Sequence, residues 1–353
     1  MDFSPVRQAG GRSRSLLQSP DSSASRFASI DLGSHTTRLL VASCPDGRAI
    51  HPLHTDRRVT RLARGFRRRG RLEEDGVRST LEALKEYARA IEGFGARSVA
   101  CGATGVVRRA ANRRDLLEAA SREAGLEIRV ISEDEEARLS AKGVLSVLEA
   151  GKGPLLIFDL GGSSTEFSLV LPEEERPVFA CSVFLGAATL TEKCLPRAPA
   201  EREDLRKALE VARENLAPSL DRCRGSRGSP KDARLVGTAG TVTTLAAMYL
   251  EMPEYRPYRV NGLQLSENWL TRTVDRLAGA SLEERRRWPG LEKGREDIVL
   301  GGALIVQAIL ESLDASSFVV TDAGLLEGLL MSGMEEAWGL PSSLRSPFSW
   351  KRS

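Results

Sequence analysis

The feature that most constrains this chain is a segment of the form strand, glycine turn, strand. In residues 155–171, LLIFDLGGSSTEFSLVL, an apolar run ends at Asp159, two glycines follow, and alternating apolar residues resume after Glu166. Apolar runs of this length predict buried strands. No helix follows the glycines directly, so the segment is neither a dinucleotide-binding fingerprint nor a P-loop.

The turn of this segment favours contact with phosphate. Adjacent Gly161 and Gly162 let bare backbone amides approach a ligand closely. Hydroxyl groups that can donate to phosphate oxygens follow the glycines, on Ser163, Ser164 and Thr165. The carboxylates of Asp159 and Glu166 suit Mg²⁺ rather than the phosphate itself. Taken alone, the segment is explained equally well as an ordinary hairpin with a Gly-Gly turn.

A second copy decides between these interpretations. Residues 27–42, FASIDLGSHTTRLLVA, repeat the order apolar strand, Asp31, Gly33, Ser34, hydroxyl pair, apolar strand. A repeat at domain spacing indicates two similar halves that face a shared cleft. Two phosphate-binding hairpins opposed across a cleft are typical of the actin-like ATPase fold. We therefore expect an α/β protein with two actin-like (ribonuclease H-like) domains facing a central cleft.

Two further segments predict phosphate contacts. Residues 234–248, RLVGTAGTVTTLAAM, read as a short strand, a loop from Gly237 to Gly240, and a helix whose N-terminus attracts anions. Residues 98–103 read as a strand that ends at Thr104-Gly105 and is followed by Arg108. The sequence thus predicts phosphate contacts at Gly237 and Gly240, and a further one in the segment after the 98–103 strand.

Composition fits a two-domain enzyme without membrane segments. The 353 residues suffice for two cores, with 41% hydrophobic and 28% charged residues and a net charge of +3. The five cysteines stand singly, which predicts free thiols in a reducing compartment and argues against zinc. No apolar run approaches the roughly 20 residues of a membrane span. We expect a cytoplasmic protein that does not bind membranes.

The predicted domain organisation follows from the repeat. Residues 1–26, rich in Ser and Arg, are expected to form a disordered tail. The first domain is assigned to residues 27–135 and the second to residues 136–323. A C-terminal helix, about 324–341, is expected to pack back on the first domain, and residues 342–353 to form a flexible tail.

An arginine-rich passage follows the first hairpin. Eight of the fifteen residues in 57–71 are Arg. Most charge runs are solvated surfaces, but an arginine cluster near a phosphate cleft favours polyanion contact. Nucleic acid is the less favoured polyanion because only Phe66 interleaves the arginines. The residues predicted to bind a polyanion are Arg64, Arg67, Arg68 and Arg69.

Helical patterns flank these motifs. Amphipathic helices are predicted over 73–94, 113–124 and 201–222, and a strongly apolar helix over 298–313. Ser132 is a predicted N-cap, followed by four acidic residues at 133–136. Complementarity to the helix dipole explains acids at these positions, and composition alone does not separate one from another.

The quoted motifs resemble the Ppx/GppA family of exopolyphosphatases and guanosine pentaphosphate phosphatases, in its short two-domain form. The resemblance runs from about Phe27 to Met334. It rests on segments in the family's order: IDLGSHTTRLLVA, ATGVVRRAANRRD, EDEEARLSAKGV, DLGGSSTE, LVGTAGTVTTLAA, PGLEKGREDIVLGGALI and TDAGLLEGLL. Any single match is weak, whereas the ordered set is specific.

The resemblance implies roles for individual residues. Glu136 falls on the family's catalytic glutamate, the base toward the attacking water. Asp159 and Glu166 fall on carboxylates associated with Mg²⁺, to which a monovalent cation can be added, and Arg108 falls on a phosphate-contacting arginine. The residues implied to bind phosphate in the two loops are Asp31, Gly33, Ser34, His35, Gly161, Gly162, Ser163, Ser164 and Thr165.

The implied activity is release of terminal orthophosphate from inorganic polyphosphate. A guanosine polyphosphate (pppGpp) hydrolysed at the same site is the alternative, and a homodimer is a possible state. Two departures from the family pattern, His35 for the usual Asn and Ser163 for a third Gly, keep a non-catalytic polyphosphate or alarmone sensor open. A sugar or acetate kinase would need an acceptor signature that is not evident.

Overall fold

The computed structural model describes residues 25–45, 47, 49–148, 153–171, 174, 177–226, 233–339 and 348. The predicted tails lie outside these residues, apart from Ser25, Arg26 and Phe348. Strand β1 begins at Arg26, inside the segment expected to be a tail. No helix in the described part of the chain is both long enough and apolar enough to cross a membrane.

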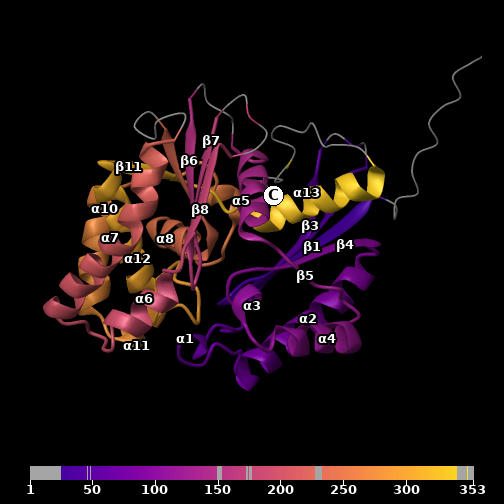
Figure 1. Cartoon of the computed structure of the whole chain (residues 1–353), viewed down its shortest axis with the longest axis horizontal. Helices are drawn as coiled ribbons and strands as arrows, with labels where there is room; N and C mark the ends of the chain where they lie inside the picture. Colours follow the sequence, from indigo (N-terminus) through magenta and orange to yellow (C-terminus); the bar gives the residue numbers. More distant parts are fainter. Residues whose placement is uncertain are drawn as a thin grey trace, which may run out of the picture.

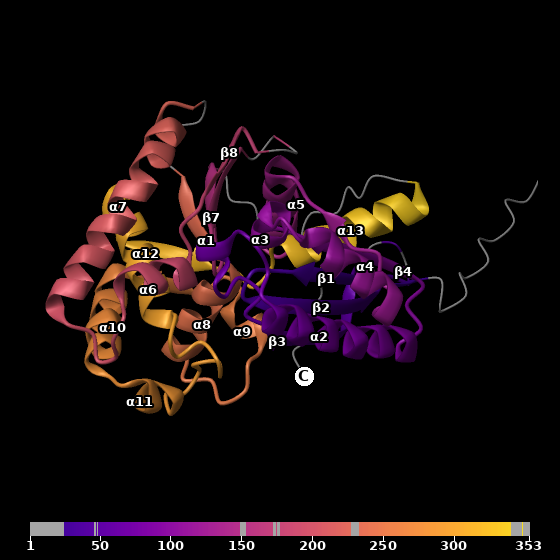
Figure 2. The same ribbon diagram turned by 60° about the horizontal axis from the view of Figure 1, so that its bottom comes forward.

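The first domain is built on a sheet with the strand order β3-β2-β1-β4-β5 (Figure 1). Its strands are β1 (Arg26–Leu32), β2 (Thr36–Ser43), β3 (His51–Val59), β4 (Ser98–Ala103) and β5 (Arg129–Val130). Alternate residues of β1 face opposite sides. Ile30 packs toward α2 (Glu74–Gly93) and α4 (Arg113–Ala124), whereas Phe27 packs toward α13 (Leu325–Trp338). Figure 1 shows α13 on the far side of these strands from α2 and α4, and Figure 2 shows α2 beside β2 on the side away from α13.

The second domain repeats this topology. Its sheet has the order β10-β11-β9-β6-β7-β8. The strands are β6 (Leu155–Leu160), β7 (Thr165–Val170), β8 (Phe179–Val183), β9 (Arg234–Thr238), β10 (Gln264–Ser266) and β11 (Ser317–Val320). In each domain the hairpin is antiparallel and its first strand pairs in parallel with the strand beyond, β1 with β4 and β6 with β9. The repeat in the sequence is therefore a repeat of structure.

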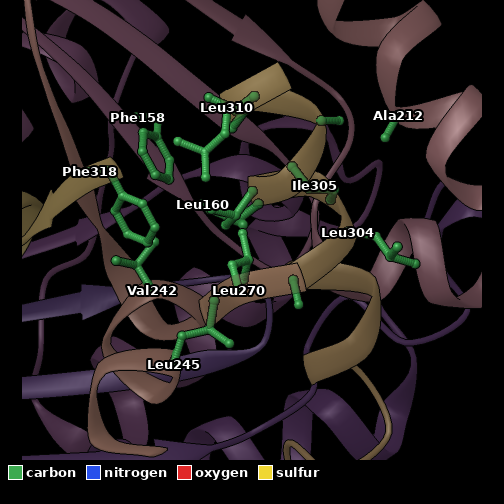
Figure 3. Packing of buried hydrophobic residues seen from close by; sticks show 14 of the residues in the cluster. Phe158, Leu160, Ala212, Val242, Leu245, Leu270, Leu304, Ile305, Leu310 and Phe318 are labelled. Carbon is green, nitrogen blue, oxygen red and sulfur yellow. The ribbon is translucent and has the colours of Figure 1, made fainter. Parts of the chain in front are cut away.

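Helices cover the outer face of the second sheet and bury the largest core. They are α6 (Ala187–Cys194), α7 (Arg202–Arg224), α8 (Ala239–Tyr249), α9 (Pro257–Val260), α10 (Glu267–Gly279), α11 (Leu282–Arg286) and α12 (Val299–Leu313). Figure 3 shows the aromatic rings of Phe158 and Phe318 beside aliphatic side chains of α8 and α12. Helix α12 is buried along most of its length, as its apolar sequence predicts.

Two helices cross between the sheets. Helix α5 (Glu133–Leu145) packs its Val144 against the second sheet, while α13 packs Leu330 against the first. Their backbones approach so closely that a Cβ on Gly328 would lie 1.9 Å from the Leu139 carbonyl oxygen. The predicted domain boundary after residue 135 falls inside α5, so no break in the chain marks it.

The local predictions hold where patterns are long and fail where they are short. Strand 98–103 and helix 113–124 have the predicted bounds, and Ser132 caps α5 by accepting a hydrogen bond from the Glu135 amide at 3.2 Å. The predicted loop from Gly237 to Gly240 is wrong, because β9 continues through Thr238 and α8 begins at Ala239. The short helices α1 (Phe66–Arg69) and α3 (Gly105–Arg109) were not predicted.

We predict that Gly328→Ala lowers the free energy of unfolding by about 1–3 kcal/mol, the usual cost of overpacking. The added methyl group would meet the backbone of α5, which cannot yield without separating the two helices. Urea unfolding measures the change. Gly279→Ala is the matched control, since a Cβ there meets nothing within 4 Å and Ala is the better helix former. Equal stability of the two variants would contradict the prediction.

Candidate active site

A small cavity of about 90 Å³ lies between the two hairpin turns. Both domains line it, and the turns of the β1–β2 and β6–β7 hairpins form opposite walls. It collects most of the predicted site residues: Asp31, Gly33, Ser34, His35, Glu136, Asp159, Gly161, Gly162, Ser163, Ser164, Glu166 and Gly240. The hairpin repeat therefore brings its two turns to one place.

The two turns touch each other directly. The hydroxyl oxygens of Ser34 and Ser163 lie 2.7 Å apart in a hydrogen bond across the domain interface, and both side chains are buried. The Val106 amide also donates to the Ser34 hydroxyl, at 3.3 Å. This contact needs Gly105, which has a φ of +50° and whose Cβ would lie 2.7 Å from the Ser34 hydroxyl. Ser163, the departure from the family's third glycine, thus links the two domains.

Carboxylates converge on the cavity from four elements, β1, α5, β6 and β7. Asp31 is the next-to-last residue of β1, Glu136 lies in the first turn of α5, and Asp159 and Glu166 face each other across the β6–β7 hairpin. Burial raises the pKa of Asp31 to about 7, with added repulsion from Asp159 and Glu136. Burial likewise raises the pKa of Glu136, of Asp159 and most strongly of Glu166. These side chains are poised to accept a proton or a cation.

Hydroxyl groups orient two of these carboxylates. Ser140 of α5 donates to Asp159 Oδ2 at 2.9 Å, and Ser182 of β8 donates to Glu166 Oε1 at 2.8 Å. Asp31 differs, because its Oδ1 is buried without a hydrogen-bond partner among the described residues. A buried acceptor of this kind is costly unless a ligand or ion satisfies it.

Three arginines that were not predicted as site residues also line the cavity. Arg38 pairs with Asp322 at 3.1 Å, Arg57 pairs with Glu292 at 3.1 Å, and buried Arg295 donates to Thr36 Oγ1 at 2.8 Å. Each of these contacts joins the two domains. The acids compensate the guanidinium charges only in part, because Glu292 is shared between Arg57 and Arg295. The cavity thus has a cationic wall beside its carboxylates.

Glu136 is held at the edge of the cavity by Arg108. Arg108 Nη1 donates to Glu136 Oε2 and to the Ile131 carbonyl oxygen, both at 2.8 Å. This ion pair lowers the pKa of Glu136 but does not outweigh its burial. Arg108 itself does not line the cavity, so its predicted phosphate contact stays a prediction.

Other predicted residues lie away from the cavity. Thr165 donates to the Leu185 carbonyl oxygen at 2.6 Å and so supports the turn from behind. Gly237 lies in β9 against the ring of Phe158, where a Cβ would approach within 2.5 Å. Arg64, Arg68 and Arg69 are exposed, and the Arg67 side chain is outside the described part. Their polyanion contact stays a prediction.

His35 is neutral in this site. Burial lowers its pKa to about 4, and the nearby charges of Arg295 and Arg61 act in the same direction. Its Nε2 lies 3.4 Å from the Gly294 carbonyl oxygen of the second domain, and its carbonyl oxygen accepts from the amides of Thr60 and Arg61. Thr60 and Arg61, which precede the exposed arginines, are therefore bonded directly to a residue of the cavity wall.

A larger cavity of about 510 Å³ adjoins the first at Arg38 and Arg57, which line both. Its wall includes apolar and aromatic side chains, among them Tyr255 and Trp288, together with the acids Asp56, Glu292, Asp322 and Glu327. Arg57 lies 5.3 Å from the ring centre of Tyr255. Unlike the first cavity, this one suits a partly apolar, planar group.

Among the described residues, no group of three or more His, Cys, Asp or Glu is close enough to form a metal site unaided. Mg²⁺ does not require such a cage, because it is usually bound by one or two carboxylates, water and substrate phosphates. The oxygen donors present and the unpartnered Asp31 Oδ1 fit that pattern.

The fold and site define a two-domain α/β protein with a cleft lined by carboxylates, hydroxyl groups and arginines. The sequence profile of the Ppx/GppA phosphatase family matches residues 40–337. Exopolyphosphatase 2 of Mycobacterium tuberculosis is 32% identical over 323 residues, 87% of this chain and 98% of that protein. The chain belongs to the Ppx/GppA phosphatase family and is a hydrolase.

Solved structures agree with this assignment. The Aquifex aeolicus member of the family is 31% identical, with a TM-score of 0.72 over 88% of this chain and 98% of that chain. An exopolyphosphatase from Cytophaga hutchinsonii, at 22% identity, has a TM-score of 0.80 over 90% of this chain and 99% of that chain, and supports the fold. The predicted fold of two actin-like α/β domains around a cleft is confirmed.

We predict that Asp31→Asn stabilises the protein in EDTA increasingly as the pH rises from 4 to 7. Burial raises the pKa of Asp31 from its ordinary value of 3.8 to about 7 in the folded state. The protonated side chain therefore contributes its full stabilisation below pH 3.8, and this stabilisation is lost as the pH rises through 7. Asn carries no charge at any of these pH values. At pH 8 we expect a gain of about 1–2 kcal/mol, allowing for solvent relaxation around the cleft.

Thermal unfolding between pH 4 and pH 8 measures this gain. Asp75→Asn, at an exposed aspartate of α2, is the control and should show no such trend. A gain at Asp31 that does not vary with pH would show that the carboxylate is ionised in the fold.

Proposed function

We propose that this protein is an exopolyphosphatase that hydrolyses the terminal phosphoanhydride of inorganic polyphosphate and releases orthophosphate. The observation that carries the proposal is Glu136, which lines the same small cavity as the two hairpin turns. The cavity of about 90 Å³ is small and lined by polar groups of both turns, which suits one terminal phosphoryl group. The family and the exopolyphosphatase relatives support the same substrate class.

In this proposal Glu136 takes the proton of the attacking water. Burial raises its pKa toward the working range of a general base. Phosphoryl transfer depends mainly on positioning and charge stabilisation. The turn amides and hydroxyls of Ser34, Ser163 and Ser164 would hold the terminal phosphate, and the arginines Arg38 and Arg295 would offset its charge.

We further propose that the enzyme uses Mg²⁺, held by Asp159 and Glu166 with Asp31 nearby. The bound ion would neutralise charge on the terminal phosphoryl group. The exposed arginines Arg64, Arg67, Arg68 and Arg69 would bind the rest of a long chain outside the cavity.

A second candidate is hydrolysis of pppGpp at the same site. It is favoured by the adjoining cavity of about 510 Å³, where Tyr255 and Trp288 could contact a base while Arg38 and Arg57 reach its phosphates. Orthophosphate release with Mg²⁺ from long-chain polyphosphate, pppGpp and ATP, at matched phosphate concentration, tests both candidates. Release mainly from polyphosphate supports the first and release mainly from pppGpp the second. Binding without release would refute both and indicate a sensor.

We predict that Glu136→Gln lowers phosphate release by about 10²–10⁴-fold, because the base is lost while the shape of the side chain is kept. Binding of polyphosphate should remain measurable by calorimetry, since the turns are intact. Glu135→Gln is the matched control from the same helical turn, where Glu135 pairs with Arg129 outside the cavity. Wild-type turnover in the Glu136 variant would remove Glu136 from the mechanism.

We predict that Tyr255→Ala raises the Kd of pppGpp by about tenfold and changes that of polyphosphate less than twofold. A stacked base is worth about 1–3 kcal/mol, whereas polyphosphate carries no base. Fluorescence anisotropy of labelled ligands measures both values. Tyr249→Ala, at an exposed tyrosine in edge-to-face contact with Trp269, is the control. Equal losses for both ligands would count against a nucleoside subsite at Tyr255.

A further inference from the structure

A line of contacts runs from the second domain to Glu136 along the edge of the cleft. The Arg109 guanidinium lies 4.5 Å from the ring centre of Phe184, which directly follows β8. Arg109 Nη2 donates to Glu133 Oε1 at 3.2 Å, and Arg108 Nη2 donates to the same oxygen at 3.3 Å. Arg108 Nη1 donates to Glu136 Oε2 at 2.8 Å. These contacts join Phe184 to the proposed base.

Arg108 is divided between two acids. An arginine that faces a single carboxylate commonly forms two parallel hydrogen bonds with it. Here Nη2 is directed to Glu133, and only Nη1 reaches Glu136. Arg108 therefore engages one oxygen of Glu136. A two-bonded pair would engage both oxygens and make Glu136 a weaker base.

We infer that Glu133 is a positioning residue that prevents Arg108 from pairing with both oxygens of Glu136. Glu133 is itself held by Arg109, whose guanidinium packs on the ring of Phe184. This inference rests on the proposed function, in which Glu136 accepts the proton of the attacking water. Loss of Glu133 lets Arg108 turn fully toward Glu136 and slows proton transfer. The phosphate-binding turns are untouched, so substrate binding is preserved.

The kinetic test compares Glu133→Gln with Glu135→Gln, since both remove one negative charge from the first turn of α5. Exposed contacts of this kind are worth up to about 1 kcal/mol, so we expect Glu133→Gln to lower kcat for polyphosphate about fivefold with KM changed less than twofold. Glu133→Asp should recover part of the loss. Phe184→Leu, which keeps an apolar side chain but removes the ring, should lower kcat about twofold.

The double variant Glu133→Gln/Phe184→Leu should be no slower than Glu133→Gln alone, because both changes act through one line of contacts. Multiplied losses would overturn the inference, as would equal kcat values for the Glu133→Gln and Glu135→Gln variants.

A crystal structure of the Glu133→Gln variant tests the geometry without relying on activity. We expect two hydrogen bonds between Arg108 and Glu136, and an unchanged single hydrogen bond would overturn the inference. If the wild type releases no orthophosphate from polyphosphate or pppGpp, the proposed function fails. The position of Arg108 in the variant crystal still decides the inference in that case.

Discussion

Burial of the carboxylates of Asp31, Glu136, Asp159 and Glu166 close together is the constraint around which the cleft is arranged. Burial raises the pKa of each, and repulsion from neighbouring acids adds to this for Asp31, Glu136 and Glu166, so the set is held at an energetic cost. These carboxylates come from both domains. The packing of α5 on α13 and the hydrogen bond between Ser34 and Ser163 hold the two domains together around them. In the proposed function, a cation-bearing polyanion would relieve this cost, since the cation would bind the acids and the phosphate would bind the arginines.

The two hairpins have the same register, and with it they place side chains of both charges in the cleft. In the first hairpin Asp31 pairs with Arg38, and in the second Asp159 pairs with Glu166, at the same spacing along the chain. Paired residues of an antiparallel hairpin project to the same face. The first domain thus has the Arg38 guanidinium at the position where the second domain has the Glu166 carboxylate. The asymmetry of the site arises from single substitutions within a symmetric scaffold.

The structural features that depend on short-range sequence patterns could be predicted from the sequence. The hairpins, the acids at their ends and the fold follow from strand periodicity and the repeat, and Arg38 could have been predicted from the hairpin register. Arg295 could not, because it lies in an irregular segment and reaches the cavity only through contacts with Thr36 and Glu292. Gly237 was misassigned because a glycine near the end of a short strand resembles a loop, and only the ring of Phe158 shows why glycine is needed.

The acids at the start of α5 show how three-dimensional contacts separate residues that composition cannot. Residues three apart on a helix share a face, so Glu133 and Glu136 lie on the side of α5 that meets Arg108, while Glu135 turns to Arg129. Glu136 is buried in the cleft, whereas Glu133 stays half-exposed. Burial raises the pKa of Glu136 and makes it a stronger proton acceptor, whereas the exposed Glu133 pairs with Arg108 and Arg109. Two like side chains on one helical face thereby acquire different chemistry from their different distance to solvent.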